Sequence, residues 1–227
     1  MVVIPEFILF LYYSKKCKFR CRPWGWQGHL SRNDMLRTNQ SFLTYMQQLY
    51  ETQQRKEDII RKTFVKGKKL LMQHDKVSRV MLLKEGIAKC FFTEENDKDY
   101  IVEFLGKGEI VGEIESIRGT TCLCTIEAIT NVEVYALSLS YFSALIKTDL
   151  KLNNLLLDVF AQRIVHTSSR ASYQQLYTIE HSLSRLLALQ AQQAVAITKE
   201  DMAAYLGVTI RSLNRALKTV QENDGHR

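Results

Sequence analysis

The carboxy-terminal part of the chain holds the side chains best suited to contact with another molecule. Between Ile210 and Gln221 every charged side chain is basic, and serine and asparagine lie among them. Arginine can donate two hydrogen bonds to the edge of guanine, and serine or asparagine can bond a base or a phosphate. The candidate residues are Arg211, Ser212, Asn214, Arg215 and Lys218. Their types favour contact with nucleic acid.

The residues around this basic face predict two short helices joined by a tight turn. Thr198 and Asp201 have the spacing of a capping box, in which each side chain bonds the other residue's amide. Gly207 can adopt the positive φ that ends a helix, and Thr209 can cap the next helix. Small residues at 203 and 207 predict a close helix crossing and a turn with no room for a side chain. The pattern is that of a helix-turn-helix, and the alternative is a pair of helices with a solvated basic face.

Catalytic patterns are missing from the sequence. The five histidines, at 29, 74, 166, 181 and 226, are scattered, and no nucleophile–base cluster, Walker loop or metal-spaced histidine pair occurs. We therefore expect a protein that is not an enzyme.

The five cysteines do not form a recognisable disulfide framework, because their number is odd and their spacing is irregular. Cys90, Cys122 and Cys124 lie in strand-like stretches, where a free cysteine packs as a small hydrophobe. Cys17 and Cys21 are the only pair whose spacing could serve a function. This cysteine usage predicts a cytoplasmic protein.

Short strands with turn residues between them are predicted from about Phe64 to Leu137. The expected strands are 80–83, 87–92, 100–105 and 132–137, rich in β-branched and aromatic residues. Spacing of this kind is typical of a β-sandwich or barrel.

A helical region follows, with no glycine or proline between Gly119 and Gly207. One long helix is expected from Tyr141 to about Tyr177, and a second from Ser182 to Gln193. The long helix carries apolar residues at spacings of seven, three and four, which favour a dimer seam over packing on its own domain. The seam residues are Leu150, Leu157, Phe160 and Ile164.

Net charge is a poor guide to the binding partner. The 227 residues are 46% hydrophobic and 24% charged, with a formal charge of +7. Residues 1–40 hold seven basic and two acidic side chains, so most of the excess lies in a basic tail. The apolar run 2–13 is too short to span a bilayer, and no signal-peptide pattern is present. We expect a poorly ordered tail, or an over-extended start with Met35 as the natural beginning.

In this order of elements the chain resembles the CRP/FNR family of transcription regulators, with a weaker likeness to its YeiL-like branch. The likeness rests on Phe64-Val65-Lys66-Gly67, on FLGKGEIVGE at 104–113 and on ITKEDMAAYLGV at 197–208. It implies an α+β fold: a β-roll (a cyclic-nucleotide-binding-like double-stranded jelly roll), a long dimerisation helix and a winged helix-turn-helix. The wing would begin near residue 224, so we expect it to be truncated or missing.

The resemblance also implies an effector site, with Gly112, Glu113, Cys122 and Leu123 at its positions. Cyclic-nucleotide binders in the family place Arg-Ser where this chain has Cys122-Leu123. A phosphate buried there would lack its charge partner. We therefore expect no tight binding of cAMP, and a structural role for Glu113 in bonding neighbouring loop amides.

A branch of the family holds an iron–sulfur cluster on four cysteines, three of them near the amino terminus. Here only Cys17 and Cys21 lie there, with Cys122 or Cys124 further on, and their spacing fits no ferredoxin-like run. We expect no iron–sulfur cluster and no other metal or cofactor.

In the helix-turn-helix the family places Arg-Glu at the start of the second helix and a second arginine four residues after the glutamate. Ile210, Arg211 and Arg215 occupy these places, so the resemblance implies an altered DNA sequence preference. Thr198, Thr209 and Lys218 match positions that contact phosphates, which fix register without reading sequence.

These observations predict four regions: a basic tail over 1–40, an effector-sensing β-roll over 41–140, a long connecting helix over 141–178 and a DNA-binding domain over 179–227. The expected protein is a homodimer that binds a near-palindromic DNA site, with RNA polymerase and an unidentified small-molecule effector as further partners, and no membrane. The alternative is a small-molecule-binding or protein-interaction module whose DNA-binding domain is degenerate.

Overall fold

The computed structural model describes residues 35–193 and 195–224. The chain divides into two compact units, 1–33 and 34–227, and every described residue belongs to the second. The predicted basic tail therefore lies almost entirely outside the described residues, as do Cys17 and Cys21 and the chain after residue 224 where a wing would begin.

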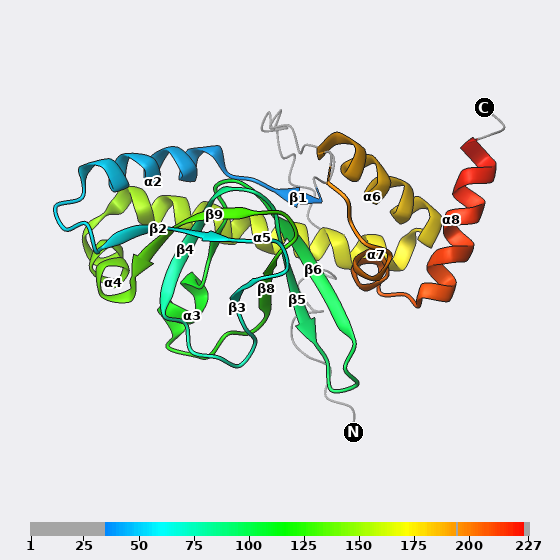
Figure 1. Ribbon diagram of the computed structural model, residues 1–227, viewed down its shortest axis with the longest axis horizontal. Coiled ribbons are helices and arrows are strands. Elements are labelled where there is room, and N and C mark those ends of the chain that lie inside the picture. Colours follow the sequence, from blue (N-terminus) through cyan, green and yellow to red (C-terminus); the bar gives the residue numbers. More distant parts are fainter. Residues whose placement is uncertain (1–34, 194, 225–227) are drawn as a thin grey trace, which may run out of the picture. The chain divides into compact units, whose positions relative to one another are not determined.

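Two β-sheets form the amino-terminal part of the described chain (Figure 1). One has five strands in the order β1-β6-β5-β8-β3, and the other has four in the order β2-β9-β4-β7. The strands are β1 Leu36–Arg37, β2 Ile59–Phe64, β3 Lys69–Leu71, β4 Arg79–Glu85, β5 Ala88–Thr93, β6 Asp99–Leu105, β7 Ile110–Val111, β8 Thr125–Ala128 and β9 Val132–Ser138. Two such sheets make the predicted double-stranded β-roll.

The four predicted strands are confirmed within one or two residues as β4, β5, β6 and β9. Buried residues from both sheets fill one core, and β4 and β9 are buried on both faces, so that their remaining apolar side chains belong to a second cluster. The sequence did not signal β1, which pairs in parallel with the end of β6. It also did not signal helix α2, Gln40–Thr52, which is capped by Asn39 and buries Phe42 and Met46. Strand β1 was missed because it has only two residues and its pairing is set by β6, which is distant in the sequence.

The helix expected over 141–177 is two helices, which corrects that expectation. Helix α4 covers Leu139–Thr148 and helix α5 covers Leu150–Leu176. Asp149, between them, has an extended conformation, and its carboxylate accepts a hydrogen bond from the Leu152 amide at 3.0 Å. The same carboxylate accepts from the Tyr45 hydroxyl of α2 at 2.8 Å. Because an acidic N-cap starts a new helix, the chain turns here without glycine or proline.

Replacing Asp149 with alanine is expected to lower the free energy of unfolding by about 1–2 kcal/mol, the usual effect of losing an N-cap. Burial opposes ionisation, but the bonds from Leu152 and Tyr45 hold the pKa of Asp149 below its usual value. A depressed pKa adds stability above the unfolded-state pKa and loses it as pH falls. Urea unfolding at neutral and acidic pH measures this, and Asp149→Asn, which keeps a capping oxygen, should retain most of the stability at neutral pH.

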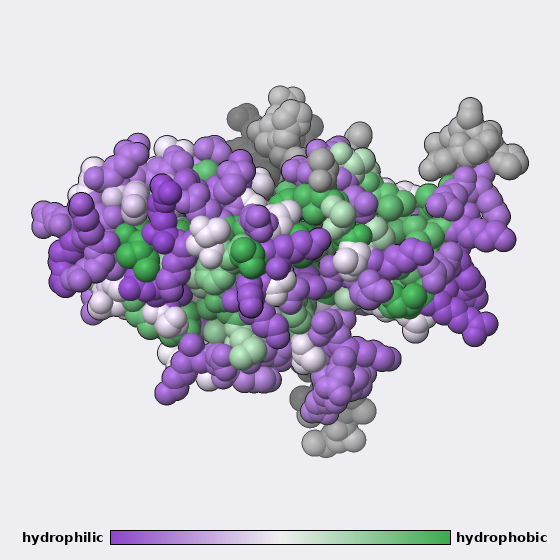
Figure 2. All heavy atoms as spheres, viewed as in Figure 1, coloured by the Kyte–Doolittle hydropathy of each residue, from purple (hydrophilic) through white to green (hydrophobic). Residues whose placement is uncertain are grey.

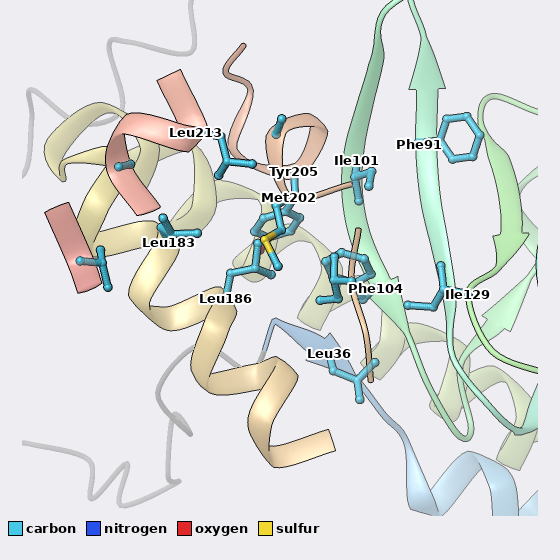
Figure 3. Close-up of a cluster of buried hydrophobic side chains, with 14 residues drawn as sticks. Leu36, Phe91, Ile101, Phe104, Ile129, Leu183, Leu186, Met202, Tyr205 and Leu213 are labelled. Carbon is cyan, nitrogen blue, oxygen red and sulfur yellow. The ribbon is translucent and has the colours of Figure 1, made fainter. Parts of the chain in front are cut away.

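Three helices follow α5: α6 Ile179–Gln193, α7 Lys199–Leu206 and α8 Ile210–Asp224. They share one buried cluster with residues of β1, β5 and β6 (Figure 3). In this view Met202 and Tyr205 of α7 lie beside Ile101 and Phe104 of β6, and Leu183 and Leu213 lie on the other side. The Tyr205 and Phe104 rings stack with their centroids 5.3 Å apart. The predicted helix-turn-helix is therefore packed on α6 and on the edge of the β-roll.

Candidate nucleic-acid interface and effector site

The turn between α7 and α8 forms as the sequence predicts, with two corrections. Thr198 caps α7 by accepting from the Asp201 amide at 3.1 Å, and Gly207 ends it with a φ of 67°. A Cβ at Gly207 would meet only the Tyr100 ring, at an ordinary 3.7 Å. Glycine is therefore needed there for its backbone conformation and not for lack of room.

The second correction concerns Asp201, which does not close the capping box. Its carboxylate accepts from Lys89 Nζ of β5 at 2.7 Å, and Lys89 also pairs with Glu127 of β8 at 3.2 Å. The acidic side chain thus joins α7 to the β-roll. Arg170 of α5 adds to this junction by donating to the Tyr205 carbonyl at 2.6 Å and to the Ile101 carbonyl at 2.7 Å.

Helix α8 presents the predicted basic residues to solvent. Arg211, Asn214, Arg215 and Lys218 are exposed and Ser212 is half-buried, while Leu213, Ala216 and Val220 are buried on the other side. In Figure 2 the visible surface of α8 is largely hydrophilic. The Thr209 oxygen accepts from the Ser212 amide at 3.2 Å and so caps the helix. Both Thr198 and Thr209 are exposed, so each lies at an accessible helix amino terminus.

Three of the basic-face side chains have local partners, and one of them is Ser212, which accepts from the Thr209 hydroxyl at 3.1 Å. Lys199 of α7 donates to the Asn214 side chain at 3.3 Å, and Lys218 lies 3.8 Å from Glu222 with both side chains exposed. Exposed pairs of this kind contribute little free energy, so they leave the side chains available for other contacts.

The candidate effector residues flank a short helix, α3, Glu113–Arg118. Gly112 precedes it with a φ of 83°, and a Cβ there would lie 2.9 Å from a Val77 methyl and 3.2 Å from the Arg79 carbonyl. At the other end of the segment Cys122 is 2% exposed and Leu123 is 62% exposed. The structure thus brings the predicted residues to one segment, with neither a charge nor a hydroxyl at 122 and 123.

Glu113 has a different partner from the one expected. Its buried carboxylate pairs with the Arg163 guanidinium of α5, and the role of bonding a loop amide falls to Glu115, which accepts from Leu123 N at 3.2 Å. Burial raises the pKa of Glu113, and the charge of Arg163 opposes this rise. Arg163 also donates to the Ile110 carbonyl at 2.7 Å.

This ion pair belongs to a larger buried network that the sequence did not reveal. Glu109, also buried, lies 3.8 Å from Arg163 and 2.8 Å from Arg37 of β1, and Arg37 bonds Glu103 of β6 at 2.7 Å. Burial raises the pKa of Glu109, while both arginines oppose the rise. An arginine on the otherwise apolar side of a predicted helix was the available signal, since such a charge needs a buried partner.

The predicted seam runs along the exposed side of α5. Leu150 is 73% exposed, Leu157 65% and Ile164 68%, whereas Phe160 is partly buried against its own domain. Leu152, Leu156 and Val159 on the opposite side are buried in the β-roll core. Three large apolar side chains at heptad spacing therefore lie in solvent in the single chain.

Two further findings concern metal ligands and membrane-spanning helices in the described part of the chain. Among residues 35–193 and 195–224, no group of three or more His, Cys, Asp or Glu side chains is arranged to hold a metal ion. Within the same residues, no helix combines the length and apolar character needed to cross a bilayer.

Part of the chain matches a known protein-family model. Residues 61–149 match the family model of the cyclic nucleotide-binding domain. No curated protein matches the sequence.

Several solved structures share the fold. A protein from Eubacterium rectale assigned to the CRP/FNR family of transcriptional regulators is 16% identical, with a TM-score of 0.65 over 77% of this chain and 87% of that one. The c-di-GMP-responsive global regulator CLP of Xanthomonas campestris is 17% identical, with a TM-score of 0.63 over 74% and 88%. A CRP-family regulator from Thermus thermophilus is 16% identical, with a TM-score of 0.62 over 72% and 85%.

Residues 61–149 are thus similar to the cyclic nucleotide-binding domain. The described chain as a whole has the α+β fold of the CRP/FNR transcription regulators, which confirms the resemblance seen in the sequence. The likeness to the YeiL-like branch stays a prediction.

Proposed function

We propose that this protein is a dimeric, sequence-specific DNA-binding transcription regulator and not an enzyme. The observation that carries the proposal is α8, whose exposed side holds Arg211, Arg215 and Lys218 while its buried side is held by α6 and α7. A helix fixed in this way can enter the major groove as a rigid body. Such a regulator would act in the cytoplasm, where it could also contact RNA polymerase.

Some of these residues can contact bases and so read the DNA sequence, and others can contact phosphates and so position the helix on the DNA. Arg211 and Arg215 lie one turn apart on α8 and can donate to base edges. Thr198, Thr209, Ser212, Asn214 and Lys218 can bond phosphates, bases or both. The exposed amino termini of α7 and α8 add a favourable dipole for phosphate binding.

The proposal includes dimerisation because one basic helix reads only half a site. The exposed seam of Leu150, Leu157 and Ile164 would pair with its copy and place two α8 helices in successive major grooves, about 34 Å apart. The DNA site would then be a near-palindrome. Effector binding would alter how the two α5 helices pair, and this change would reorient the DNA-binding parts of the dimer.

The effector of this regulator would not be cAMP. At the end of the effector segment Cys122 and Leu123 supply no positive charge, and Arg163 is already paired with Glu113. Calorimetric titration of the full-length protein with cAMP is expected to show no binding at micromolar concentration. Micromolar or tighter binding, abolished by Glu113→Gln, would contradict this prediction.

The proposed function is tested by replacing Arg211, which is expected to contact a base, and Lys218, which is expected to contact a phosphate. We expect Arg211→Ala to lose about 1–3 kcal/mol of discrimination at one base pair and so to relax sequence preference. Lys218→Ala should weaken binding to all sequences about equally and reduce the salt dependence by about one phosphate contact. Fluorescence anisotropy with a selected palindrome and its single-base variants, at several salt concentrations, measures both effects.

The control for these measurements is Lys62→Ala, which removes an exposed lysine of β2 in the β-roll. It should leave both affinity and specificity unchanged. A wild-type protein that shows no salt-sensitive, sequence-dependent shift with genomic fragments around its own gene would refute the proposed function.

A further inference from the structure

Two free cysteines in the β-roll lie in direct contact through their sulfur atoms. Cys90 of β5 and Cys124, which immediately precedes β8, have their Sγ atoms 2.9 Å apart. They are separated by 34 positions in the sequence, so the contact is made by the pairing of β5 with β8. Neither residue takes part in the basic face of α8 or in the ion pairs of Glu113.

The strand register places the two residues close to the range of a disulfide but just outside it. Cys90 pairs with Ile126 and Phe91 with Thr125, so Cys124 is a diagonal neighbour of Cys90. Diagonal neighbours have Cα atoms about 7–8 Å apart, and a disulfide needs about 4.4–6.8 Å. Because Cys124 lies just outside the regular ladder, a small shift of its backbone brings the pair into range without breaking β8.

The two thiols differ in access. Cys90 is 7% exposed, and its hydrogen bond with Cys124 together with burial raises its pKa. Cys124 is half-buried and is therefore the sulfur that a small oxidant reaches first. Cys90 already contacts Cys124 and would be the resolving thiol, which attacks the oxidised Cys124 sulfur.

We propose that Cys90 and Cys124 form an oxidisable dithiol that closes to an intrachain disulfide with a small peroxide as oxidant. The Cys124 thiolate attacks one peroxide oxygen, the O–O bond breaks, and Cys124 becomes a sulfenic acid while hydroxide leaves. The Cys90 sulfur then attacks the Cys124 sulfur, forming the S–S bond and releasing water with the Cys90 proton. In total two thiols lose two electrons and two protons, and one peroxide becomes two waters.

The position of this link has a structural consequence for the effector segment. Residues 119–124 connect α3 to β8, and their anchors include the bonds from Leu123 N to Glu115 and from Cys122 N to the Asp75 carbonyl, at 3.2 and 2.8 Å. A disulfide at Cys124 would fasten the end of this segment covalently to β5. Cys122, two residues away, is buried and has no such sulfur contact among the described residues, which makes it the matched control.

The test is peptide mapping of the full-length protein after limited treatment with hydrogen peroxide. Free thiols are alkylated after denaturation, and the digest is analysed without reduction, so each cysteine pair is read separately. We expect the peptide that links Cys90 to Cys124 to be the main product in the wild type and in Cys122→Ser. Treatment with a thiol reductant should remove it. In Cys124→Ser, Cys90 should stay reduced, because burial denies it direct access to peroxide.

Either of two results would overturn the proposal. One is a wild-type map in which Cys124 proceeds to sulfinic acid while Cys90 remains a free thiol. The other is oxidation of Cys90 to the same extent in Cys124→Ser as in the wild type. The assay reads only sulfur chemistry, so its outcome is independent of whether the protein binds DNA.

Discussion

Replacing Arg163 with methionine is expected to lower the free energy of unfolding by about 3–5 kcal/mol, the usual loss when one member of a buried ion pair is removed. The methionine fills much of the same space, but it leaves the Glu113 carboxylate buried and without its partner. The neighbouring Glu109 loses part of its charge balance as well. Urea unfolding of the full-length protein measures the loss.

The pH dependence of this variant identifies the cause of the loss. Without Arg163, the pKa of Glu113 should rise further above its unfolded value, because burial then acts unopposed. A raised carboxyl pKa lowers stability as pH increases between the unfolded and folded values. The variant should therefore lose more stability at neutral pH than in mild acid.

Two further variants make the test specific. Adding Glu113→Gln to Arg163→Met should restore part of the stability and remove the added pH dependence, since no charge is then left unpaired. Arg118→Met, at the exposed end of α3, should change stability by no more than about 0.5 kcal/mol. If the double variant is less stable than Arg163→Met, the ion pair is not the reason for the loss.

The second large effect is expected at the seam of α5. Leu157→Lys combined with Ile164→Lys should raise the dimer dissociation constant by at least about a hundredfold, because each buried unpaired charge costs several kcal/mol. Both side chains are at least 65% exposed in the single chain, so the monomer itself should keep its stability. Sedimentation and urea unfolding separate the two properties.

Gln162→Lys is the matched control, because residue 162 is exposed on α5 but lies away from the seam. Its lysine can pair with Asp158 at the same i, i+4 spacing that Gln162 now uses. It should leave the dimer intact. A seam variant that remains dimeric, or a wild type that is a monomer at high micromolar concentration, would show that this side of α5 is not the dimer interface.

The local patterns were the part of the fold that the sequence could predict. Four strands and the helix-turn-helix were found because runs of β-branched and aromatic residues between turns, threonine caps and Gly207 depend only on neighbouring residues. The division of the long helix at Asp149 was missed, because its cap is reinforced by Tyr45, more than 100 positions away. Asp201 was predicted to cap its own helix, but its carboxylate pairs with Lys89, which is distant in the sequence.

In the candidate sites too, the sequence predicted the local features and missed the contacts between distant residues. The exposure of Arg211, Arg215 and Lys218 follows from helical periodicity, which places them opposite Leu213 and Ala216. Glu113 was recognised in its turn, but its partner on α5 could not be found, since no sequence spacing relates residues 113 and 163. The same reason hid the contact of Cys90 with Cys124.

The sequence by itself determined the order of elements, the basic face of α8 and the exposed apolar side chains of α5 that we propose as a dimer seam, because each follows from the spacing of neighbouring residues. Only the tertiary structure decided which charges are buried together and which thiols meet. Those contacts arise where strands and helices from distant parts of the chain pack side by side. They depend on the register of β5 with β8 and on the seating of α5 against the β-roll, and both are products of the whole core.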